Sequence, residues 1–214
     1  MKLYGYFRSS AAYRVRIALN LKGLAYDSAA VHLVRGGGEQ FCAEFLALNP
    51  QGLVPAFEDG GAVLTQSLAI LEYLEETHPE PALLPDDPVE RARVRALALA
   101  IACDIHPLNN LRVLSYVSGT LGQGDEARAA WYRHWVETGL AAVEALVAGH
   151  PMTGTFCHGD TPSHADLCLV PQIANARRFD CDLTPCPELV RIDAACAALA
   201  AFIDAAPQNQ PDAE

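Results

Sequence analysis

The segment RSSAAYRVRIAL, from Arg8 to Leu19, decides how the first part of the chain is expected to fold. It follows a short β-pattern at residues 3–7 and opens directly into a helical pattern. Ser9 and Ser10 stand at the junction, where a serine hydroxyl accepts hydrogen bonds from the free amides of the first helical turn. The same amides, together with the positive end of the helix dipole, can hold an anion such as a thiolate. Helix capping alone would also explain both serines, so other features must decide between the two roles.

The pattern on either side of this segment predicts strands that alternate with helices. We expect strands at 2–7 and 29–33, helices at 10–22 and 39–48, a hairpin between 53 and 64, and a helix that begins near Ser67. Gly23 is placed to end the first helix, and Pro55 stands where a strand starts, as a candidate cis peptide bond. This order is typical of a mixed sheet covered by helices.

The second half of the chain lacks strand periodicity. A proline-dense acidic stretch separates the halves, and we place the boundaries at 1–80, 81–88 (linker) and 89–214. Helices are predicted at 89–105, 127–148, from residue 163 onward and at 188–203, with Ser163 and Asp166 in the spacing of a capping box. The Gln/Pro/Asp-rich segment from Pro207 is expected to be loose. The fold class is therefore α+β, a sheet domain followed by an all-α domain.

Composition limits the classes of function. The net charge of −11 argues against a nucleic-acid partner, because phosphates require a basic surface. We see no leader segment and no apolar run near the roughly 20 residues of a spanning helix, so we expect a cytoplasmic protein without a membrane partner. The seven cysteines lack Cys-x-x-Cys or His-spaced patterns, which predicts free thiols and no metal site.

The segment from Ser9 to Leu19, with Val54-Pro55 at a strand mouth and Gln66-Ser67 at a helix start, resembles the zeta class of soluble glutathione transferases, the maleylacetoacetate isomerases. The likeness extends to the stretches ALNP at 47–50, QSLAI at 66–70, LLP at 83–85, ADL at 165–167, VPQ at 170–172 and DLTP at 182–185. It implies a thioredoxin-like glutathione-binding domain, with Pro55 cis, followed by an α-helical bundle. One position departs from the family's Ser-Ser-Cys, because Ala11 stands where the cysteine would be.

The resemblance implies glutathione as cofactor and assigns residues to its parts. Gln66 and Ser67 would bind the γ-glutamyl carboxylate at a helix N-terminus. The backbone of Val54 would pair with the cysteinyl part, and Gln40 would lie near the glycyl end. Each of these residues alone would be interpreted as part of a turn or cap, and their combination favours a binding site.

The resemblance also implies a cis–trans isomerisation of maleylacetoacetate to fumarylacetoacetate in Tyr and Phe degradation, by thiolate addition, bond rotation and elimination. Ser9, with Ser10 as second choice, would donate to the thiolate and lower the thiol pKa from about 8.5. Arg14 would assist catalysis, although a structural arginine is an equal alternative at this position. Since Ala11 provides no thiol, the hydroxyls of the first turn are the only candidates there.

The substrate carries carboxylates, so cationic side chains matter. The positions of Arg8 and Arg178 imply a substrate-binding role. His106 and Asn110, spaced i and i+4 and hence expected on one helix face, are assigned to both substrate and cofactor, and Arg112 to the cofactor. Bacterial relatives that act on maleylpyruvate carry the tripeptide Asn-Asn-Arg, and in this chain Leu111 replaces its arginine. This difference favours maleylacetoacetate as the substrate.

Three alternatives remain open at this point. The chain could be a maleylpyruvate isomerase of gentisate-type aromatic catabolism, or a zeta-class transferase that displaces halide from α-haloacids. It could also be a non-catalytic binding module, against which the retained serines, Gln66-Ser67 and the arginines argue. The resemblance further implies a homodimer whose other partners are small molecules, glutathione and a dicarboxylate.

Overall fold

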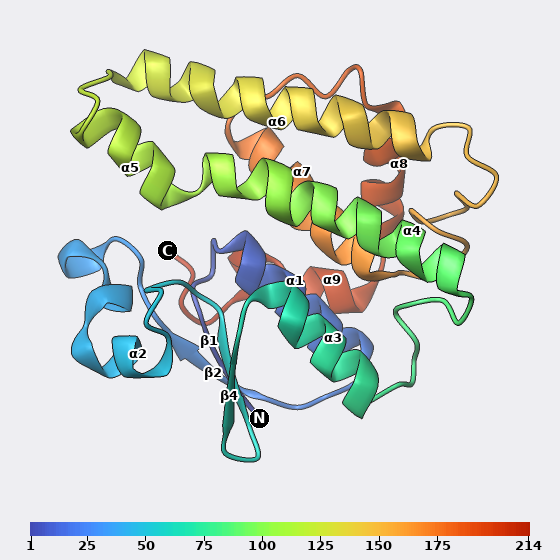
Figure 1. The fold of residues 1–214 in the computed structure, drawn as a ribbon, viewed down its shortest axis with the longest axis horizontal. Helices are drawn as coiled ribbons and strands as arrows, with labels where there is room; N and C mark the ends of the chain where they lie inside the picture. Colours follow the sequence, from blue (N-terminus) through green and yellow to red (C-terminus); the bar gives the residue numbers. More distant parts are fainter. The chain divides into compact units, whose positions relative to one another are not determined.

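The computed structural model describes all residues from 1 to 214, and they form two compact units (Figure 1). The first unit comprises Met1–Ala82 together with Ala197–Glu214, and the second comprises Leu83–Cys196. The passage from the first unit to the second falls within the linker predicted at 81–88. The segment Ala197–Glu214, which the sequence predicts to belong to the helical domain at 89–214, groups instead with the sheet.

The first unit contains a four-stranded mixed sheet. Its strands are β1 Lys2–Gly5, β2 Asp27–Ala30, β3 Ala56–Asp59 and β4 Ala62–Thr65. They lie in the order β2-β1-β3-β4, with β1 and β2 parallel and the other two pairs antiparallel. The predicted mixed sheet and hairpin are confirmed. The strand predicted at 29–33 begins earlier, because β2 pairs with β1 from Asp27 and Val31 only adds one further bond, from its N–H to the Gly5 carbonyl (2.7 Å).

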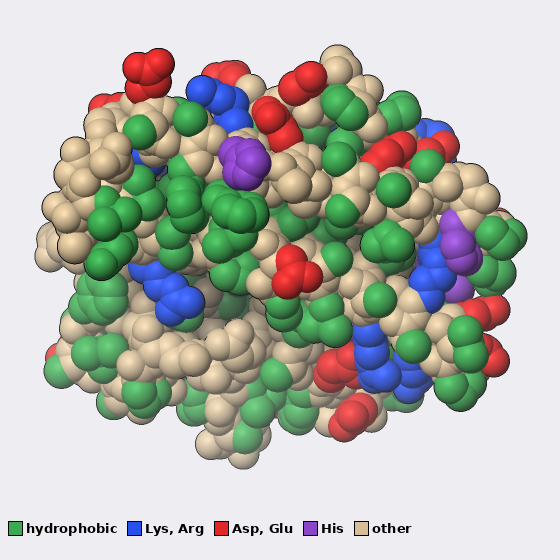
Figure 2. All heavy atoms as spheres, turned by 45° about the horizontal axis from the view of Figure 1, so that its top comes forward, with side chains coloured by type: hydrophobic (Ala, Val, Ile, Leu, Met, Phe, Trp, Pro, Cys, Tyr) green, Lys and Arg blue, Asp and Glu red, His purple; other side chains and the backbone are tan.

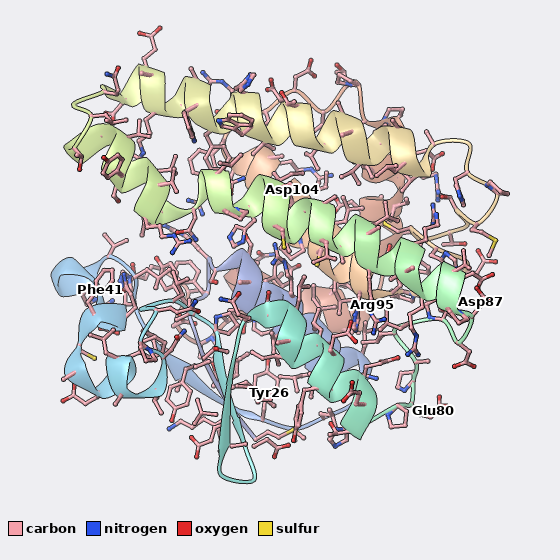
Figure 3. The ribbon with its side chains drawn as sticks, in the orientation of Figure 1. Tyr26, Phe41, Glu80, Asp87, Arg95 and Asp104 are labelled. Carbon is pink, nitrogen blue, oxygen red and sulfur yellow. The ribbon has the colours of Figure 1, made fainter.

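Helices complete the first unit. They are α1 Ser10–Leu21, α2 Ala43–Leu48, α3 Ser67–Thr77 and α9 Ala200–Ala205, with 3-10 turns at Arg35–Gly37, Glu39–Phe41 and Pro207–Asn209. α1 ends before Gly23 as predicted, and this glycine has the left-handed φ of 64° that side chains disfavour. The helix predicted at 39–48 is interrupted by extended Cys42. Phe41, on the turn that precedes α2 (Figure 3), is therefore 59% exposed and does not share a buried face with Phe45.

The core of the first unit lies around α1, which packs against both α3 and α9 (Figure 1). Ile17, Leu19, Phe57 and Leu74 are completely buried there. Lys22, just past the end of α1, is also buried and donates to Glu75 (2.8 Å) and to the carbonyls of His78 (2.6 Å) and Pro81 (2.9 Å). These acceptors use all three ammonium protons, so the buried charge is compensated.

The second unit is built from helices, as predicted for this part of the chain. They are α4 Pro88–Leu99, α5 Leu111–Gly119, α6 Asp125–Val147, α7 His164–Arg178 and α8 Pro187–Cys196. A π-helical stretch, Ala100–Ile105, and a 3-10 turn, His106–Asn109, connect α4 to α5; Figure 3 labels Asp104 in this stretch. No helix of the chain combines the length and apolarity that crossing a membrane requires.

The predicted capping box opens α7. The Asp166 carboxylate accepts from the backbone N–H (2.8 Å) and hydroxyl (2.8 Å) of Ser163 and from the N–H of Cys157 (2.9 Å). Asp166 is fully buried. Burial raises its pKa, although these hydrogen bonds act in the opposite direction. Its role as a cap is confirmed.

Two expectations for the end of the chain are wrong. The helix predicted at 188–203 is interrupted after Cys196, so that α8 and α9 belong to different units. The segment from Pro207 is not loose, because Asp212 accepts from the N–H of Phe7 (3.0 Å) and Glu214 pairs with Arg35. Hydrophobic periodicity predicts helices and strands, but it does not predict hydrogen bonds and ion pairs between segments that are far apart in the chain.

The seven cysteines are free thiols in different environments. Cys42 and Cys103 are exposed, Cys181 is half-buried, and the others (Cys157, Cys168, Cys186 and Cys196) are buried. Burial raises the pKa of Cys157, Cys186 and Cys196, and it raises the pKa of Cys181 to about 11.

We therefore predict that only two of the seven thiols, Cys42 and Cys103, react rapidly with an aromatic disulfide reagent in the native protein. The reacting species is the thiolate, which is scarce where burial raises the pKa. The measurement is the absorbance of the released thiolate at mildly alkaline pH, with the protein unfolded in denaturant as the control that exposes all seven. Rapid reaction of more than two native thiols would contradict the burial described here.

Candidate functional site

Ser9 occupies the junction between β1 and α1, and the predicted cap is confirmed. Its hydroxyl accepts from the N–H of Ala12 (3.2 Å), and its own N–H donates to the Tyr6 carbonyl (2.9 Å). A hydroxyl that accepts one bond still has its proton to donate, so capping leaves Ser9 able to bind an anion. Ser10 is the first residue of α1 and is only 5% exposed, whereas Ser9 is half-buried.

Arg14 is a buried cation without a counter-ion. It is 2% exposed, and its Nη1 donates to the Ser67 hydroxyl (3.2 Å), which links α1 to the first residue of α3. Its Nε and Nη2 are buried without a partner. An unpaired buried charge costs several kcal/mol, as an order of magnitude. The amides at the starts of α1 and α3 add further positive potential, so this place suits a carboxylate ligand.

Arg16, two residues further on, is also buried but is paired. Its Nη2 donates to the Phe7 carbonyl (3.0 Å) and its Nε to the Ala205 carbonyl (2.9 Å). Burial lowers the pKa of Arg16 to about 10, so it stays protonated at neutral pH. The sequence analysis did not single out this residue. A charged side chain within an otherwise apolar run, between Val15 and Ile17, was the available signal.

The chain approaches α3 through two unusual backbone conformations. Val54-Pro55 is a cis peptide bond, as expected, and Val54 lies beyond the strand ladder, which starts at Ala56. Gln66 precedes α3 with a left-handed φ of 69°. Its side-chain amide nitrogen donates to the side-chain oxygen of Gln51 (2.8 Å). Gln66 is exposed while Ser67 is buried.

Gln40 is buried on the 3-10 turn Glu39–Phe41. Its amide nitrogen donates to the Leu33 carbonyl (3.3 Å), and its Oε1 has no partner. A Cβ at Gly38, whose φ is 107°, would lie 2.6 Å from the Gln40 amide. The positive φ of Gly38 strains any other residue at this position, which favours glycine.

In the second unit, the expectation that His106 and Asn110 share one helix face is wrong. His106 starts the 3-10 turn, and Pro107 has no N–H to continue a helix. Asn110 is extended and caps α5, its side-chain oxygen accepting from the N–H of Arg112 (3.1 Å). The side chain of Arg112 and neighbouring Leu111 are exposed.

Arg178, the last residue of α7, rests on an aromatic support that the sequence analysis missed. Its guanidinium lies over the Phe179 ring (4.7 Å), and that ring stacks on Tyr132 of α6 (3.7 Å between centroids, 21° between planes). Tyr132 is 2% exposed, and burial raises its pKa. The turn that follows is closed by the left-handed Asp180 (φ 53°).

Arg8 shows a similar arrangement in the first unit. It is exposed, and its guanidinium lies over the ring of Phe7 (4.7 Å). On the face shown in Figure 2, basic side chains occur in separate small groups and form no continuous basic surface. No group of three or more His, Cys, Asp or Glu is arranged to hold a metal ion.

The predicted residues thus fall into two sets, each described within its own unit. The first unit connects Ser9, Arg14 and Ser67 through α1 and the Arg14–Ser67 hydrogen bond. The second unit contains His106, Asn110 and Arg112 between α4 and α5, and Arg178 at the end of α7.

Comparison with known proteins assigns the chain to a family. Residues 3–82 match the model of the glutathione S-transferase N-terminal domain. A probable maleylacetoacetate isomerase of Vibrio cholerae is 56% identical over 211 residues, which cover 99% of this chain and 97% of the relative. A maleylpyruvate isomerase of a Ralstonia species is 53% identical over 212 residues, 99% of both chains.

Solved structures agree. A holo maleylpyruvate isomerase, described as a bacterial zeta-class glutathione S-transferase, has a TM-score of 0.97 at 52% identity over both whole chains. A maleylacetoacetate isomerase of Methylobacterium extorquens AM1 with bound malonate and glutathione has a TM-score of 0.96 at 46% identity over both whole chains. The Anaeromyxobacter dehalogenans enzyme of the same name, with dicarboxyethyl glutathione and citrate in its active site, has a TM-score of 0.86 at 47% identity, covering 100% of this chain and 93% of that one. With this fold and this identity along its whole length, the chain belongs to the zeta class of the glutathione S-transferases.

Proposed function

We propose that this protein is a glutathione-dependent cis–trans isomerase that converts maleylacetoacetate to fumarylacetoacetate in aromatic amino acid degradation. The observation that carries the proposal is the Ser9 hydroxyl, which caps α1 and still has a proton to donate. The names of the relatives, and the glutathione and carboxylate ligands of the related structures, support the same activity.

The first unit has polar groups that suit glutathione. Arg14 leaves two nitrogens, Nε and Nη2, unpaired and Gln40 leaves its side-chain carbonyl oxygen unpaired, all of them buried. Such atoms need partners, and a peptide with carboxylates and amides supplies both kinds. We assign the γ-glutamyl carboxylate to Gln66, Ser67 and Arg14, and the glycyl end to Gln40. The backbone of Val54 is assigned to the cysteinyl part.

When bound, glutathione supplies a thiolate, which can add reversibly to the substrate double bond and so permit rotation. Ser9 stabilises the charge on the sulfur by donating a hydrogen bond from its hydroxyl group. The positive end of the α1 dipole stabilises the same charge. The burial of Ser10 supports Ser9 as the donor. Ala11 supplies no competing thiol.

We further propose that Arg8 and Arg178, with His106, Asn110 and Arg112, bind the anionic groups of substrate and cofactor. Both Arg8 and Arg178 are exposed over a ring, which orients the guanidinium plane while its N–H edge can bind a carboxylate. Asn110 uses its side-chain oxygen as a cap, which leaves its NH₂ group as the donor for such contacts.

A second candidate, maleylpyruvate isomerase, is favoured by the Ralstonia relative and by the structure with a TM-score of 0.97. The two substrates share the cis double bond and the carboxylates, so the same residues would serve both.

As part of the proposal, the protein is a cytoplasmic homodimer that binds only small molecules. Its seven free thiols suit a reducing compartment, and light scattering would test the dimer.

The proposal predicts that purified protein consumes cis substrate only when glutathione is present, with a higher kcat/KM for maleylacetoacetate than for maleylpyruvate. The measurement is the loss of each cis acid in side-by-side assays, with S-methylglutathione as a control that binds without a free thiol. A preference for maleylpyruvate would establish the second candidate. Retention on immobilised glutathione without any turnover would indicate a binding module.

Replacing Ser9 with Ala is expected to raise the pKa of the bound thiol by about one unit and to lower turnover at neutral pH about tenfold, because less thiolate forms. Turnover should recover as pH rises toward the new pKa. Ser9→Thr keeps the hydroxyl and the cap, so it should behave like the native protein. A larger loss in Ser10→Ala than in Ser9→Ala would transfer the role to Ser10.

Replacing Arg14 with Met is expected to leave the melting temperature of the ligand-free protein unchanged or higher, because an unpaired buried charge is removed. The additional stabilisation by glutathione should fall, since binding stabilises in proportion to affinity. Thermal melts across glutathione concentrations measure both effects. Arg16→Met is the matched control, and it should destabilise the ligand-free protein because two backbone carbonyls lose their donor. Equal destabilisation by both variants would contradict our interpretation of Arg14.

A further inference from the structure

The turn that presents Ser9 has its backbone held by charged side chains. Within this turn, the N–H of Ser9 donates to the Tyr6 carbonyl (2.9 Å). The Phe7 carbonyl accepts from Arg16 (3.0 Å), and the Phe7 N–H donates to the Asp212 carboxylate (3.0 Å). Phe7 is only 3% exposed, so its N–H would otherwise be buried without an acceptor.

The segment that carries Asp212 is also attached along α1. Three side chains of α1 donate to carbonyls of α9: Tyr13 to Phe202 (3.2 Å), Arg16 to Ala205 (2.9 Å) and Asn20 to Ala201 (3.0 Å). The last four carbonyls of a helix have no partner within the helix, so Tyr13 and Arg16 satisfy groups at Phe202 and Ala205 that would otherwise need water. α9 is therefore fixed to the helix that Ser9 caps.

Residues on both sides of Asp212 are fixed as well. The side chain of Gln210 donates to the carbonyls of Asp204 (2.8 Å) and Ala206 (3.0 Å), and Glu214 pairs with Arg35. The path of residues 210–214 is thus defined before and after Asp212, which keeps its carboxylate at Phe7.

We propose that Asp212 is a positioning residue for Ser9: by accepting from the Phe7 N–H, it holds the turn from which the Ser9 hydroxyl is directed. A carboxylate is a stronger acceptor for an N–H than a neutral oxygen. Small displacements of a reacting group can cost up to about a hundredfold in rate. This inference rests on the proposed role of Ser9 toward the cofactor sulfur. It adds Asp212, in the segment Ala197–Glu214, as a second residue on which the position of the Ser9 hydroxyl depends.

The test compares Asp212→Ala, Asp212→Asn and, as a control, Asp204→Ala in the full chain. Asp204 is exposed on α9, and only its backbone carbonyl makes a bond described above. In Asp212→Ala we expect faster amide hydrogen exchange in the peptide that covers Phe7 and Ser9, measured without ligand. With glutathione, we expect a higher pKa of the bound thiol by thiolate absorbance and about a tenfold lower kcat. The KM for glutathione should change little, because the residues assigned to its carboxylates are untouched.

Asp212→Asn keeps an acceptor oxygen for the Phe7 N–H, so it should restore most of the thiol pKa and kcat. Asp204→Ala should match the native protein in every measurement. Native-like exchange and kcat in Asp212→Ala would overturn the proposal. So would a lower melting temperature with the thiol pKa unmoved, which is the pattern of a purely structural contact. Faster exchange in a protein that neither binds glutathione nor isomerises would show that Asp212 holds the turn but that the function assigned to Ser9 is wrong.

Discussion

The first unit depends on the hydrogen bonds of Arg16, a buried guanidinium that joins the turn before Ser9 to the end of α9. A buried charge is tolerated only when its donors are satisfied, and here backbone carbonyls from two distant segments satisfy them. The segments that pack on α1 to complete the sheet unit also determine where the capping hydroxyl of Ser9 lies.

Arg14 shows the opposite condition on the same helix. It is equally buried, but it has one hydroxyl partner, and its Nε and Nη2 nitrogens have no partner. Proteins tolerate such violations mainly at functional sites, where a ligand completes what the fold leaves open. The two arginines, two residues apart, therefore differ in one respect: the fold supplies acceptors for Arg16, whereas Nε and Nη2 of Arg14 are left without a partner. Composition and spacing do not make this distinction, since both residues read simply as Arg in the motif RVR.

The second unit shows how a loop and a helix end can present polar groups without a shared helix face. Asn110 leaves the helical path to cap α5, and Arg178 is supported by Phe179 and the buried Tyr132. An aromatic ring beneath a guanidinium restricts the orientation of its plane, and a planar guanidinium is suited to binding a carboxylate.

The sequence by itself determined the features that depend on neighbours a few residues away. The Ser9 cap, the glycine that ends α1, the hairpin and the capping box at Asp166 follow from backbone groups satisfied locally. The mixed sheet and its helices followed from periodicity, and the cis bond at Pro55 and the glutathione transferase fold were expected from the motifs. The tertiary structure alone decided the break between α8 and α9 and the interruption of the helix at Asn110. It also decided which partners Arg14 and Arg16 find for their N–H groups. It also decided the place of Asp212, whose partner Phe7 lies 205 residues away in the chain. A hydrogen bond over that separation leaves no periodic trace, because its partners are selected by packing and by the need to satisfy buried polar groups.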